Sequence, residues 1–431
     1  MVDSIDTPMR LKCDASAASH QGMVRENNED AWLCDAELGL FVVADGMGGH
    51  SAGEIASQHA CEVVKQRIAE ARPLIRSLRR DSPQEDWAEL QQVIERAIGE
   101  ACRSIHDIAA KDPTKQGMGT TLTLLVVAGD QGIMGHVGDS RLYLSRGGQI
   151  YQLSEDHTYV WQMMQKGRMS PEEARFSPFS HLLTRAVGQQ PQVEVDTLLF
   201  DLVPGDALIL CSDGLHDYVH EPAQDLQPFL EGDGAEGVAD ALVQWALGNG
   251  GEDNVTAVVV RLRGEALQHH EQVTLQFSTL QKTTLFRYIN YEEMLRALNV
   301  VEIEEVEAGS FIVAEGDEGQ ELFVLLSGEV VVTKAGEILR ELSPGAHFGE
   351  MALINRAPRS ASVRALTPCR LLVISENGLY SLMRNEPRIA NKIMWGLVEV
   401  LSSRLRENSD SLARLFKENK AMAHQLSGDT E

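Results

Sequence analysis

The sequence is short of basic and aromatic residues. Its 431 residues include 38 Lys and Arg against 64 Asp and Glu, which gives a formal net charge of −26, and only 5% of the residues are aromatic. Because nucleic acid is bound mainly through Lys and Arg contacts to phosphate, this balance excludes nucleic acid as the main partner. We interpret most of the acidic surplus as a solvated surface, and it is also compatible with an acidic metal site.

Cysteine pairs and long apolar runs are missing as well. The six cysteines form no CxxC motif and several lie inside apolar runs, so we interpret them as reduced core residues of a cytoplasmic protein. The first ten residues, MVDSIDTPMR, are acidic and do not resemble a secretory signal. No apolar stretch approaches the ~18 residues of a membrane-spanning helix, so we expect no membrane partner.

What the chain does contain fits two globular domains. Residues 1–263 mix strand-like and helical patterns, and two helical segments follow one another between the first strand-like runs. Strict strand–helix alternation is therefore absent, and we predict the α+β class with segregated layers. The expected strands are 40–44, 121–127, 132–137, 142–144, 207–211 and 255–262, and the expected helices are 52–71, 86–110 and 235–247.

The pattern changes after a polar stretch at 264–284, which we interpret as a linker to a second domain at 285–431. A helix is expected at 285–298, followed from 300 to 374 by short β-type runs with frequent turn signals, which are typical of a small antiparallel barrel or sandwich. A long helix is expected from about 387 to 423. Its Leu401, Leu405, Leu412 and Leu415, with Asn408 in the same row, predict either a coiled-coil dimer seam or packing against the chain's own barrel.

Five short motifs in the first domain each place an aspartate beside a glycine or at the edge of an apolar run. They are RENNED (25–30), ADGMGG (44–49), HVGDSR (136–141), CSDGLHD (211–217) and GGEDNVT (250–256). A single Asp-Gly is a common turn, but turns alone do not explain five such motifs, three of which follow apolar strands directly. Strand ends and turns are also where rigid scaffolds present functional groups.

Carboxylates gathered in one place need a cation. Two unit charges at ~4 Å repel by on the order of 4 kcal/mol at an effective dielectric constant of ~20. A donor set of oxygen atoms without His or Cys indicates Mg²⁺ or Mn²⁺ rather than zinc. Two such ions can activate a shared water for in-line attack on phosphorus, and Arg25 offers a planar fork for the substrate phosphate.

With GTT (119–121) and LTRAVG (183–188), these motifs resemble the metal-dependent, type 2C serine/threonine protein phosphatases over roughly residues 11–263. The resemblance implies a two-sheet β-sandwich flanked by helices. It also implies hydrolysis of phosphoserine and phosphothreonine in proteins by a metal-bridged hydroxide, with two to three Mn²⁺ or Mg²⁺ ions. The implied residues are Arg25 on the substrate phosphate, Asp45 as bridging ligand, and Asp30, Gly46 (backbone carbonyl), Asp139, Asp213 and Asp253 as further ligands, with Glu29 as a weaker candidate.

One position departs from the animal-type members of that family. Met47 stands where those members carry a histidine that is proposed to protonate the leaving group, whereas bacterial-type members have methionine. The general acid is therefore unassigned, and we expect His50 to pack locally. Residues 156–176 resemble the mobile flap of the family.

The second domain carries one informative stretch, FGEMALINRAPRSASVRA (348–365). A carboxylate at a helical turn followed by an arginine suits an anion pocket, and a structural salt bridge is the alternative. Residues from about 285 to 405 resemble a cyclic-nucleotide-binding domain, which implies a β-roll with a long C-terminal helix. It also implies Glu350 on the ribose 2′-hydroxyl and Arg359 on the cyclic phosphate. The assisting residues would be Gly349, Met351, Ala352, Ser360 and Ala361, and Ser360 leads us to favour cyclic AMP over cyclic GMP.

The sequence therefore predicts a protein phosphatase that acts on phosphoproteins made by a serine/threonine kinase and is regulated by a cyclic nucleotide. Two alternatives stay open. One is a constitutive phosphatase whose second domain only dimerises or docks, and the other is a non-enzymatic sensor that binds phosphoproteins.

Overall fold

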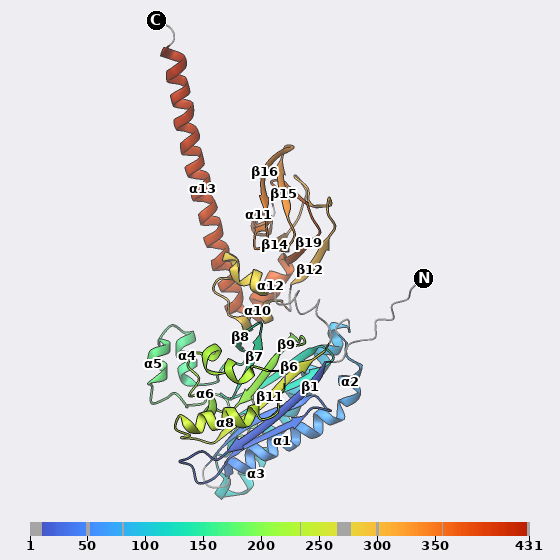
Figure 1. The fold of residues 1–431 in the computed structure, drawn as a ribbon, viewed down its shortest axis with the longest axis vertical. Helices are drawn as coiled ribbons and strands as arrows, with labels where there is room; N and C mark the ends of the chain where they lie inside the picture. Colours follow the sequence, from blue (N-terminus) through green and yellow to red (C-terminus); the bar gives the residue numbers. More distant parts are fainter. Residues whose placement is uncertain are drawn as a thin grey trace, which may run out of the picture. The chain divides into compact units, whose positions relative to one another are not determined.

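The computed structural model describes residues 11–48, 52–79, 82–232, 234–264, 277–298, 301–355 and 357–428 (Figure 1). The chain divides into two compact units, Met1–Thr274 and Leu275–Glu431, and each is described by itself. The sequence placed the second domain ten residues later, from 285. In the structure, residues 277–282 are helical, and the ring of Phe277 stacks on Tyr291 of the second unit with 4.5 Å between the ring centroids.

Two antiparallel sheets form the centre of the first unit. One has the order β1-β11-β10-β7-β8 and the other the order β2-β3-β5-β6-β9, with β4 paired to β3. The strands of the first sheet are β1 (Lys12–His20), β7 (Arg141–Arg146), β8 (Gln149–Gln152), β10 (Ala207–Cys211) and β11 (Val255–Arg263). The others are β2 (Asp30–Asp35), β3 (Leu40–Met47), β4 (Gly119–Thr120), β5 (Leu122–Ala128), β6 (Gln131–Val137) and β9 (Asp196–Asp201). The predicted α+β sandwich is thereby confirmed.

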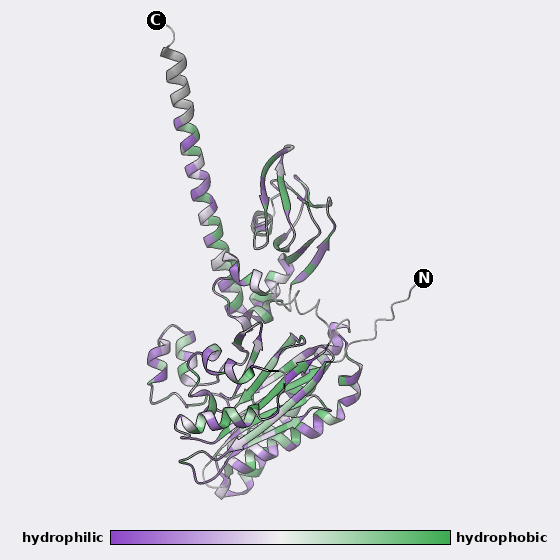
Figure 2. Cartoon of the chain, in the orientation of Figure 1, coloured by the Kyte–Doolittle hydropathy of each residue, from purple (hydrophilic) through white to green (hydrophobic). Residues whose placement is uncertain are grey.

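Helices cover the two sheets on their outer faces. Helices α1 (Ala52–Glu70) and α3 (Gln84–Lys111) pack on each other and on the β2–β9 sheet, while α8 (Val238–Gly248) packs on β1 and β11. On α3 the buried residues recur every three or four positions, so one apolar stripe faces the sheet. Figure 2 shows the hydrophobic strands enclosed between these helices. The three helices expected from the sequence are therefore present, with ends shifted by a few residues.

Several short elements complete the first unit. They are α2 (Arg72–Ser77), η1 (Pro113–Lys115), α4 (Tyr159–Gln165), α5 (Pro171–Arg175), α6 (Asp213–His216), α7 (Pro222–Asp225) and η2 (Gln227–Leu230). Helices α4 and α5 lie in the stretch that the sequence identified as a flap. All six cysteines of the chain are in the described part and are free thiols. Cys61, Cys102, Cys211 and Cys369 are buried, as predicted for core residues, whereas Cys13 and Cys34 are only half-buried.

The second unit contains two four-stranded antiparallel sheets, as expected for a β-roll. Their orders are β12-β19-β14-β17 and β13-β18-β15-β16. The strands are β12 (Glu302–Val306), β13 (Phe311–Val313), β14 (Glu321–Ser327), β15 (Val330–Lys334), β16 (Glu337–Leu342), β17 (His347–Phe348), β18 (Ser362–Ala365) and β19 (Cys369–Ser375). The other elements are η3 (Thr284–Phe286), α10 (Tyr291–Leu298), α11 (Glu350–Asn355), α12 (Glu376–Asn385) and α13 (Pro387–Gly428).

The first helix after the linker begins later than predicted. Helix α10 starts at Tyr291 instead of residue 285 because Asn290 caps it. The Asn290 Oδ1 accepts a hydrogen bond from the Glu293 N–H at 2.8 Å, and the Glu293 Oε2 accepts one from the Asn290 N–H at 3.0 Å. This reciprocal capping pair fixes the start of a helix, and a 3₁₀ turn precedes it.

Helix α13 differs in burial along its length. Ile389, Ile393 and Leu397 are buried, whereas Leu405 is 68% exposed and Leu412 is 56% exposed. Helix α13 packs on η3 and α12, which accounts for the burial near its start, and the described apolar residues from Leu405 onward are left uncovered. In the described part of the chain, none of the helices is both long enough and apolar enough to cross a membrane.

Candidate functional site

The first candidate site forms where strands β2 and β3 meet. Asp30, the first residue of β2, lies opposite Asp45 near the end of β3. The Asp30 Oδ2 accepts hydrogen bonds from the Ser212 Oγ at 2.8 Å and the Thr256 Oγ1 at 2.6 Å. The Asp30 Oδ1 is buried without a partner among the described residues. Burial raises the pKa of Asp30 to about 7, so ionising this carboxyl inside the fold is unfavourable.

Neighbouring strands hold the backbone of Asp45. Its N–H donates to the Thr121 Oγ1 at 2.9 Å, and its carbonyl accepts from the Thr121 N–H and the Thr120 Oγ1, both at 2.8 Å. The GTT motif thus has a positioning role that its sequence did not reveal. Burial raises the pKa of Asp45 well above its usual range, and the charges of Asp30, Asp213 and Asp139 raise it further.

Gly46 must be glycine because α1 approaches the end of β3 closely. A Cβ atom on Gly46 would lie 2.1 Å from the carbonyl oxygen of Gly53 in α1. The Glu29 carboxyl lies against Gly53 at the same place, and its Oε1 is buried without a partner in the part of the chain that the structure describes. Residues 49 and 50, which include His50, lie outside the described residues.

Asp139 and Asp213 stand at the ends of two paired strands of the other sheet. Asp213 opens α6 directly after β10, and its Oδ1 is also buried without a partner in the described part of the chain. Asp139 lies in the turn between β6 and β7 and is 6% exposed. The Nε2 of His216, in α6, lies 2.9 Å from the Asp139 carbonyl, which ties these two segments together.

Arg25 and Asp253 form the open side of the group. The Arg25 Nη2 lies 2.6 Å from the Asp253 Oδ2, and the Arg25 side chain is 55% exposed. Asn254 next to Asp253 pins the loop that carries Arg25. Its Oδ1 accepts from the Glu29 N–H at 2.7 Å, and its Nδ2 donates to the Asn27 carbonyl at 2.8 Å. The EDN and RENNED motifs therefore build one structure.

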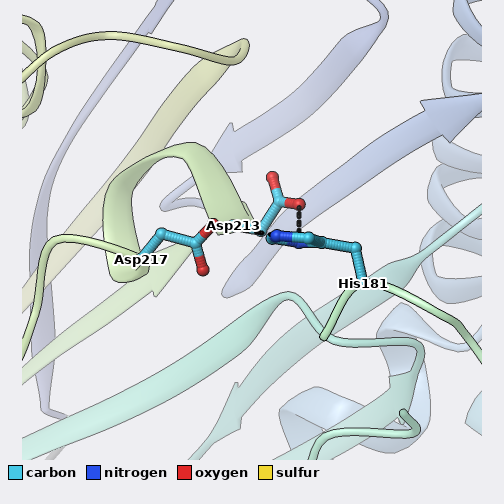
Figure 3. A group of neighbouring side chains, drawn as sticks. All are labelled: His181, Asp213 and Asp217. Atoms are coloured by element: carbon cyan, nitrogen blue, oxygen red, sulfur yellow. Dashed lines mark ion pairs between the residues drawn. The ribbon is translucent and has the colours of Figure 1, made fainter. Parts of the chain in front are cut away.

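The structure thus brings all the predicted residues of the first domain to one place. It also adds two that the sequence reasoning did not single out, His181 and Asp217 (Figure 3). The His181 Nδ1 lies 3.6 Å from the Asp213 Oδ2, and its Nε2 lies 3.8 Å from the Asp217 Oδ2. No motif marks His181, which follows the flap. Asp217 is the last residue of the CSDGLHD motif, so the sequence could have indicated it as a site residue.

The donor set of this group fits hard divalent cations. Apart from His181 the converging side chains offer carboxylate oxygens, and two of those oxygens, on Asp30 and Asp213, are buried without a partner among the residues described. Buried carboxylates are normally paired or bound to a metal. Oxygen ligands are those that Mg²⁺ and Mn²⁺ prefer.

A cavity of about 440 Å³ lies between the acidic group and the flap. Asp139, His181 and Asp217 line its polar side, and Trp161 and Met164 of α4 line the other. The flap methionine Met164 therefore borders a cavity instead of filling the core.

Met47, at the end of β3, offers no general acid. Its Sδ is contacted by the Gln189 Nε2 at 3.2 Å. Neither a thioether nor an amide can supply a proton at the pH of a cell. The general acid therefore stays unassigned.

The second candidate site is a cavity of about 90 Å³ in the β-roll. The expected residues that line it are Gly349, Glu350, Met351, Arg359, Ser360 and Ala361. The backbone of Ala352 belongs to α11, but its side chain is outside the described part. Arg359 donates to the Glu321 Oε2 and to the Glu321 carbonyl, both at 2.7 Å.

Two arginines join this cavity from outside the predicted stretch. Arg404 of α13 forms an ion pair with Glu350 and donates to the His347 carbonyl at 3.0 Å. Arg340 of β16 lines the same cavity. Sequence reasoning missed both because they are far from the FGE…RSA stretch along the chain.

Comparison with known proteins identifies both domains. Residues 18–246 match the family model of protein phosphatase 2C, and residues 303–386 match that of the cyclic nucleotide-binding domain. The serine/threonine protein phosphatase PstP of Mycobacterium tuberculosis is 37% identical over 247 residues, which are 57% of this chain and 44% of that relative.

Two further relatives extend the comparison. The serine/threonine phosphatase stp of Listeria innocua is 33% identical over 250 residues, which cover 57% of this chain and 94% of the relative. A crystal structure of the catalytic domain of PstP with two manganese ions has a TM-score of 0.50 at 35% identity, covering 59% of this chain and 99% of that one. The chain belongs to the protein phosphatase 2C family, and its second unit is a cyclic nucleotide-binding domain.

Proposed function

We propose that the protein is a metal-dependent phosphatase that hydrolyses phosphoserine and phosphothreonine in proteins. The observation that carries this proposal is the convergence of Asp30, Asp45, Asp139, Asp213 and Asp253 on one place beside Arg25, with buried carboxylate oxygens that none of the described protein groups satisfies. A structural cluster would pair those oxygens, because leaving them unpaired inside a fold is unfavourable.

In this proposal the carboxylates hold two to three Mn²⁺ or Mg²⁺ ions, and Asp45 lies at their centre. Bound ions would neutralise the carboxylates and lower the pKa of a water that attacks phosphorus. The support comes from the oxygen-rich donor set and from the relative PstP, whose catalytic domain was crystallised with two manganese ions. The Gly46 carbonyl is a further donor at the same strand end.

The remaining residues position the substrate. Arg25 is half exposed and faces the cluster, so its guanidinium can hold two oxygens of a phosphoryl group. Asp253 fixes the guanidinium from behind at 2.6 Å. Ser212 and Thr256 orient Asp30 through its Oδ2, which leaves the Oδ1 directed at the site.

The test is hydrolysis of a phosphothreonine peptide by the full chain, with Mn²⁺, Mg²⁺ or EDTA. We expect turnover that requires the metal. Asp45→Asn should reduce turnover by at least about 100-fold, because it removes a proposed metal ligand itself and not merely a residue that hydrogen-bonds to a ligand. The matched control is Glu95→Gln, which neutralises an exposed carboxylate on α3 and should leave turnover unchanged.

The alternatives have distinct outcomes in the same assay. If no divalent metal supports turnover while the protein still binds the phosphopeptide, the chain is a phosphoprotein sensor. If the Asp45→Asn protein keeps wild-type turnover, the site assignment is wrong.

We propose further that a cyclic nucleotide in the second unit regulates this activity. The ion pair between Glu350 and Arg404 connects α13 to the start of α11, and a ribose hydroxyl at Glu350 would compete with Arg404 for that carboxylate. In this proposal α13 has two arrangements, one with the Glu350–Arg404 ion pair and one without it. A ligand that binds these two arrangements with different affinity shifts their populations. Turnover with and without saturating cyclic AMP or cyclic GMP tests the coupling, and turnover that ignores both nucleotides leaves a constitutive phosphatase. Ser360 makes us favour cyclic AMP.

We also propose that α13, from Leu405 onward, pairs with the same helix of a second copy. Leu405, Leu412 and Phe416 are 68%, 56% and 73% exposed and recur at spacings of seven and four. That spacing suits a coiled-coil seam. Light scattering on the full chain should give a dimer, and Leu405→Lys should give a monomer while the exposed control Glu407→Lys should not. A monomeric wild type at high micromolar concentration would reject this pairing.

A further inference from the structure

The buried residue His157 connects the flap to the turn that carries Asp139. It lies where the flap begins, next to Asp156, and it is 6% exposed. Its backbone N–H donates a hydrogen bond to the Gly138 carbonyl at 2.7 Å, and the Gly138 N–H donates one to the His157 Nδ1 at 3.1 Å. This reciprocal pair of hydrogen bonds therefore holds the residue that directly precedes Asp139.

The contact with Gly138 determines which ring nitrogen of His157 carries the hydrogen. A backbone N–H can only donate, so Nδ1 is the acceptor, and in the neutral ring the hydrogen is on Nε2. The Nε2 lies 3.1 Å from the Asp196 Oδ2. The Arg185 Nη1 lies 3.2 Å from the same nitrogen and donates to the Asp196 Oδ1 at 2.6 Å. Asp196 thus accepts from both groups and holds the ring with its Nδ1 directed at Gly138.

The far end of the flap returns to the same histidine. The His157 carbonyl accepts a hydrogen bond from the Thr184 N–H at 2.7 Å. Thr184 and Arg185 belong to the LTRAVG motif, which contributes no residue to the acidic group. The motif therefore closes the base of the flap on His157 and supplies the arginine that holds Asp196.

The turn between β6 and β7 is held from its other side by the GTT motif. Gly138 has a φ of +114°, and a Cβ atom there would lie 2.6 Å from the Cβ of Thr121. The Ser140 Oγ, one residue after Asp139, lies 2.7 Å from the Thr121 Oγ1. Thr121 thus supports the turn on one side and His157 on the other, with Asp139 between the two supports.

We infer that His157 is a positioning residue, whose Nδ1 sets the affinity of the metal ion that Asp139 holds. This inference rests on the function proposed above. A residue that orients a metal ligand typically changes metal affinity by about 10–100-fold when it is replaced. Without an acceptor at the Nδ1 position, the Gly138 N–H loses its partner, and the turn no longer presents Asp139 in one fixed orientation.

The experiment is calorimetric titration of the metal-free full chain with Mn²⁺. Asp139→Asn identifies the ion that Asp139 holds, because binding of that ion is lost or weakened in this variant. His157→Asn keeps an acceptor close to the position of Nδ1, His157→Gln keeps a polar group only at the position of Nε2, and His157→Leu keeps neither. We expect the Leu and Gln variants to weaken the ion of Asp139 by about 10–100-fold and the Asn variant to stay within about threefold of wild type.

Thermal unfolding in EDTA separates positioning from a purely structural role. The matched control is His59→Leu, which removes a half-buried imidazole whose Nε2 lies 2.6 Å from the Ser104 Oγ, between α1 and α3. It should lower the unfolding temperature and leave the Mn²⁺ affinities unchanged. If His157→Leu behaves in the same way, His157 only supports the fold and the inference is overturned. Equal weakening by the Asn and Gln variants, which keeps the test sharp if the Leu variant does not fold, would overturn the role of Nδ1.

The failure of the inference differs from the failure of the proposed function. If Mn²⁺ supports turnover of a phosphothreonine peptide but Asp139→Asn binds Mn²⁺ as the wild type does, the inference is overturned and the phosphatase function stands. If the wild type binds no Mn²⁺, both are overturned.

Discussion

Replacing Asp45 by asparagine should stabilise the metal-free protein and destabilise the metal-loaded one. Asp45 lies among Asp30, Asp139 and Asp213, and its pKa is raised by burial and then by their charges. The asparagine side chain keeps the shape of the aspartate and removes its charge. Without a cation, losing a charge from this group relieves repulsion. With a cation bound, the same change removes a ligand.

The magnitude follows from the cluster itself. The pKa of Asp30 rises from 3.8 to about 7, and at about 1.4 kcal/mol per tenfold change, holding that carboxylate ionised at pH 8 costs about 4 kcal/mol. Two unit charges ~4 Å apart at an effective dielectric constant of ~20 give a similar repulsion, about 4 kcal/mol. The buried asparagine amide leaves its N–H donors unsatisfied, which costs about 1–3 kcal/mol and offsets part of the stabilisation gained by removing the charge. We therefore expect Asp45→Asn to increase the free energy of unfolding by about 2 kcal/mol in EDTA at pH 8.

The sign of the pH dependence can be checked on the wild type. A carboxyl whose pKa is higher in the folded than in the unfolded state binds its proton more tightly when folded. The contribution of Asp30 to the stability of the metal-free protein should therefore decrease as the pH rises from about 4 to about 7. Mn²⁺ at 100 times its Kd should restore about 2.7 kcal/mol to the wild type and much less to Asp45→Asn.

The assay is calorimetric unfolding at pH 8, with EDTA or with Mn²⁺, on the wild type, Asp45→Asn and the control Glu95→Gln. The expected signature is a crossover, with the variant more stable in EDTA and the wild type more stable in Mn²⁺. If Asp45→Asn is destabilised equally in both conditions, Asp45 is a structural carboxylate and the reasoning is refuted.

Three further predictions concern the same unit. Arg25→Ala should raise KM for a phosphopeptide by about tenfold or more with little change in stability, because the side chain is half exposed; equal KM values would remove Arg25 from the substrate site. The pKa of His181, which the neighbouring Asp213 carboxylate raises to about 9 in the metal-free protein, should fall when Mg²⁺ neutralises Asp213, as an NMR titration of the ring would show; a pKa still near 9 in Mg²⁺ would mean that Asp213 holds no ion. Asp206→Asn should cost about 3–5 kcal/mol in urea unfolding, because it leaves the Arg146 guanidinium buried without its carboxylate; a loss below about 1 kcal/mol would contradict that account.

Local sequence determined where the functional groups stand. An apolar strand that ends on an aspartate followed by glycine has few physical explanations, so Asp45 and Asp213 could be identified without a structure. The same holds for Glu350 and Arg359, whose spacing around a short helical turn places both on one anion pocket. Strong periodicity likewise predicted the long helices α1, α3 and α13, since 3.6-residue patterns over many turns are hard to misread.

Elements with weak local signals were missed. Strand β1, KCDASAASH, consists mostly of Ala and Ser and has no apolar alternation. It is a strand because it pairs along its whole length with β11, from Lys12 opposite Arg263 to His20 opposite Val255. A pairing between the two ends of the first unit leaves no trace in a short sequence window.

The sequence by itself determined the chemistry of this protein, namely which residues bear carboxylates and guanidiniums and which of them stand at strand ends. Only the tertiary structure decided which distant groups share a site. His181 reaches Asp213, Arg404 reaches Glu350, and Arg340 lines the same cavity as Arg359. The physical reason is that helix and strand patterns report local backbone geometry, whereas these meetings depend on how sheets and helices pack, which no short stretch encodes.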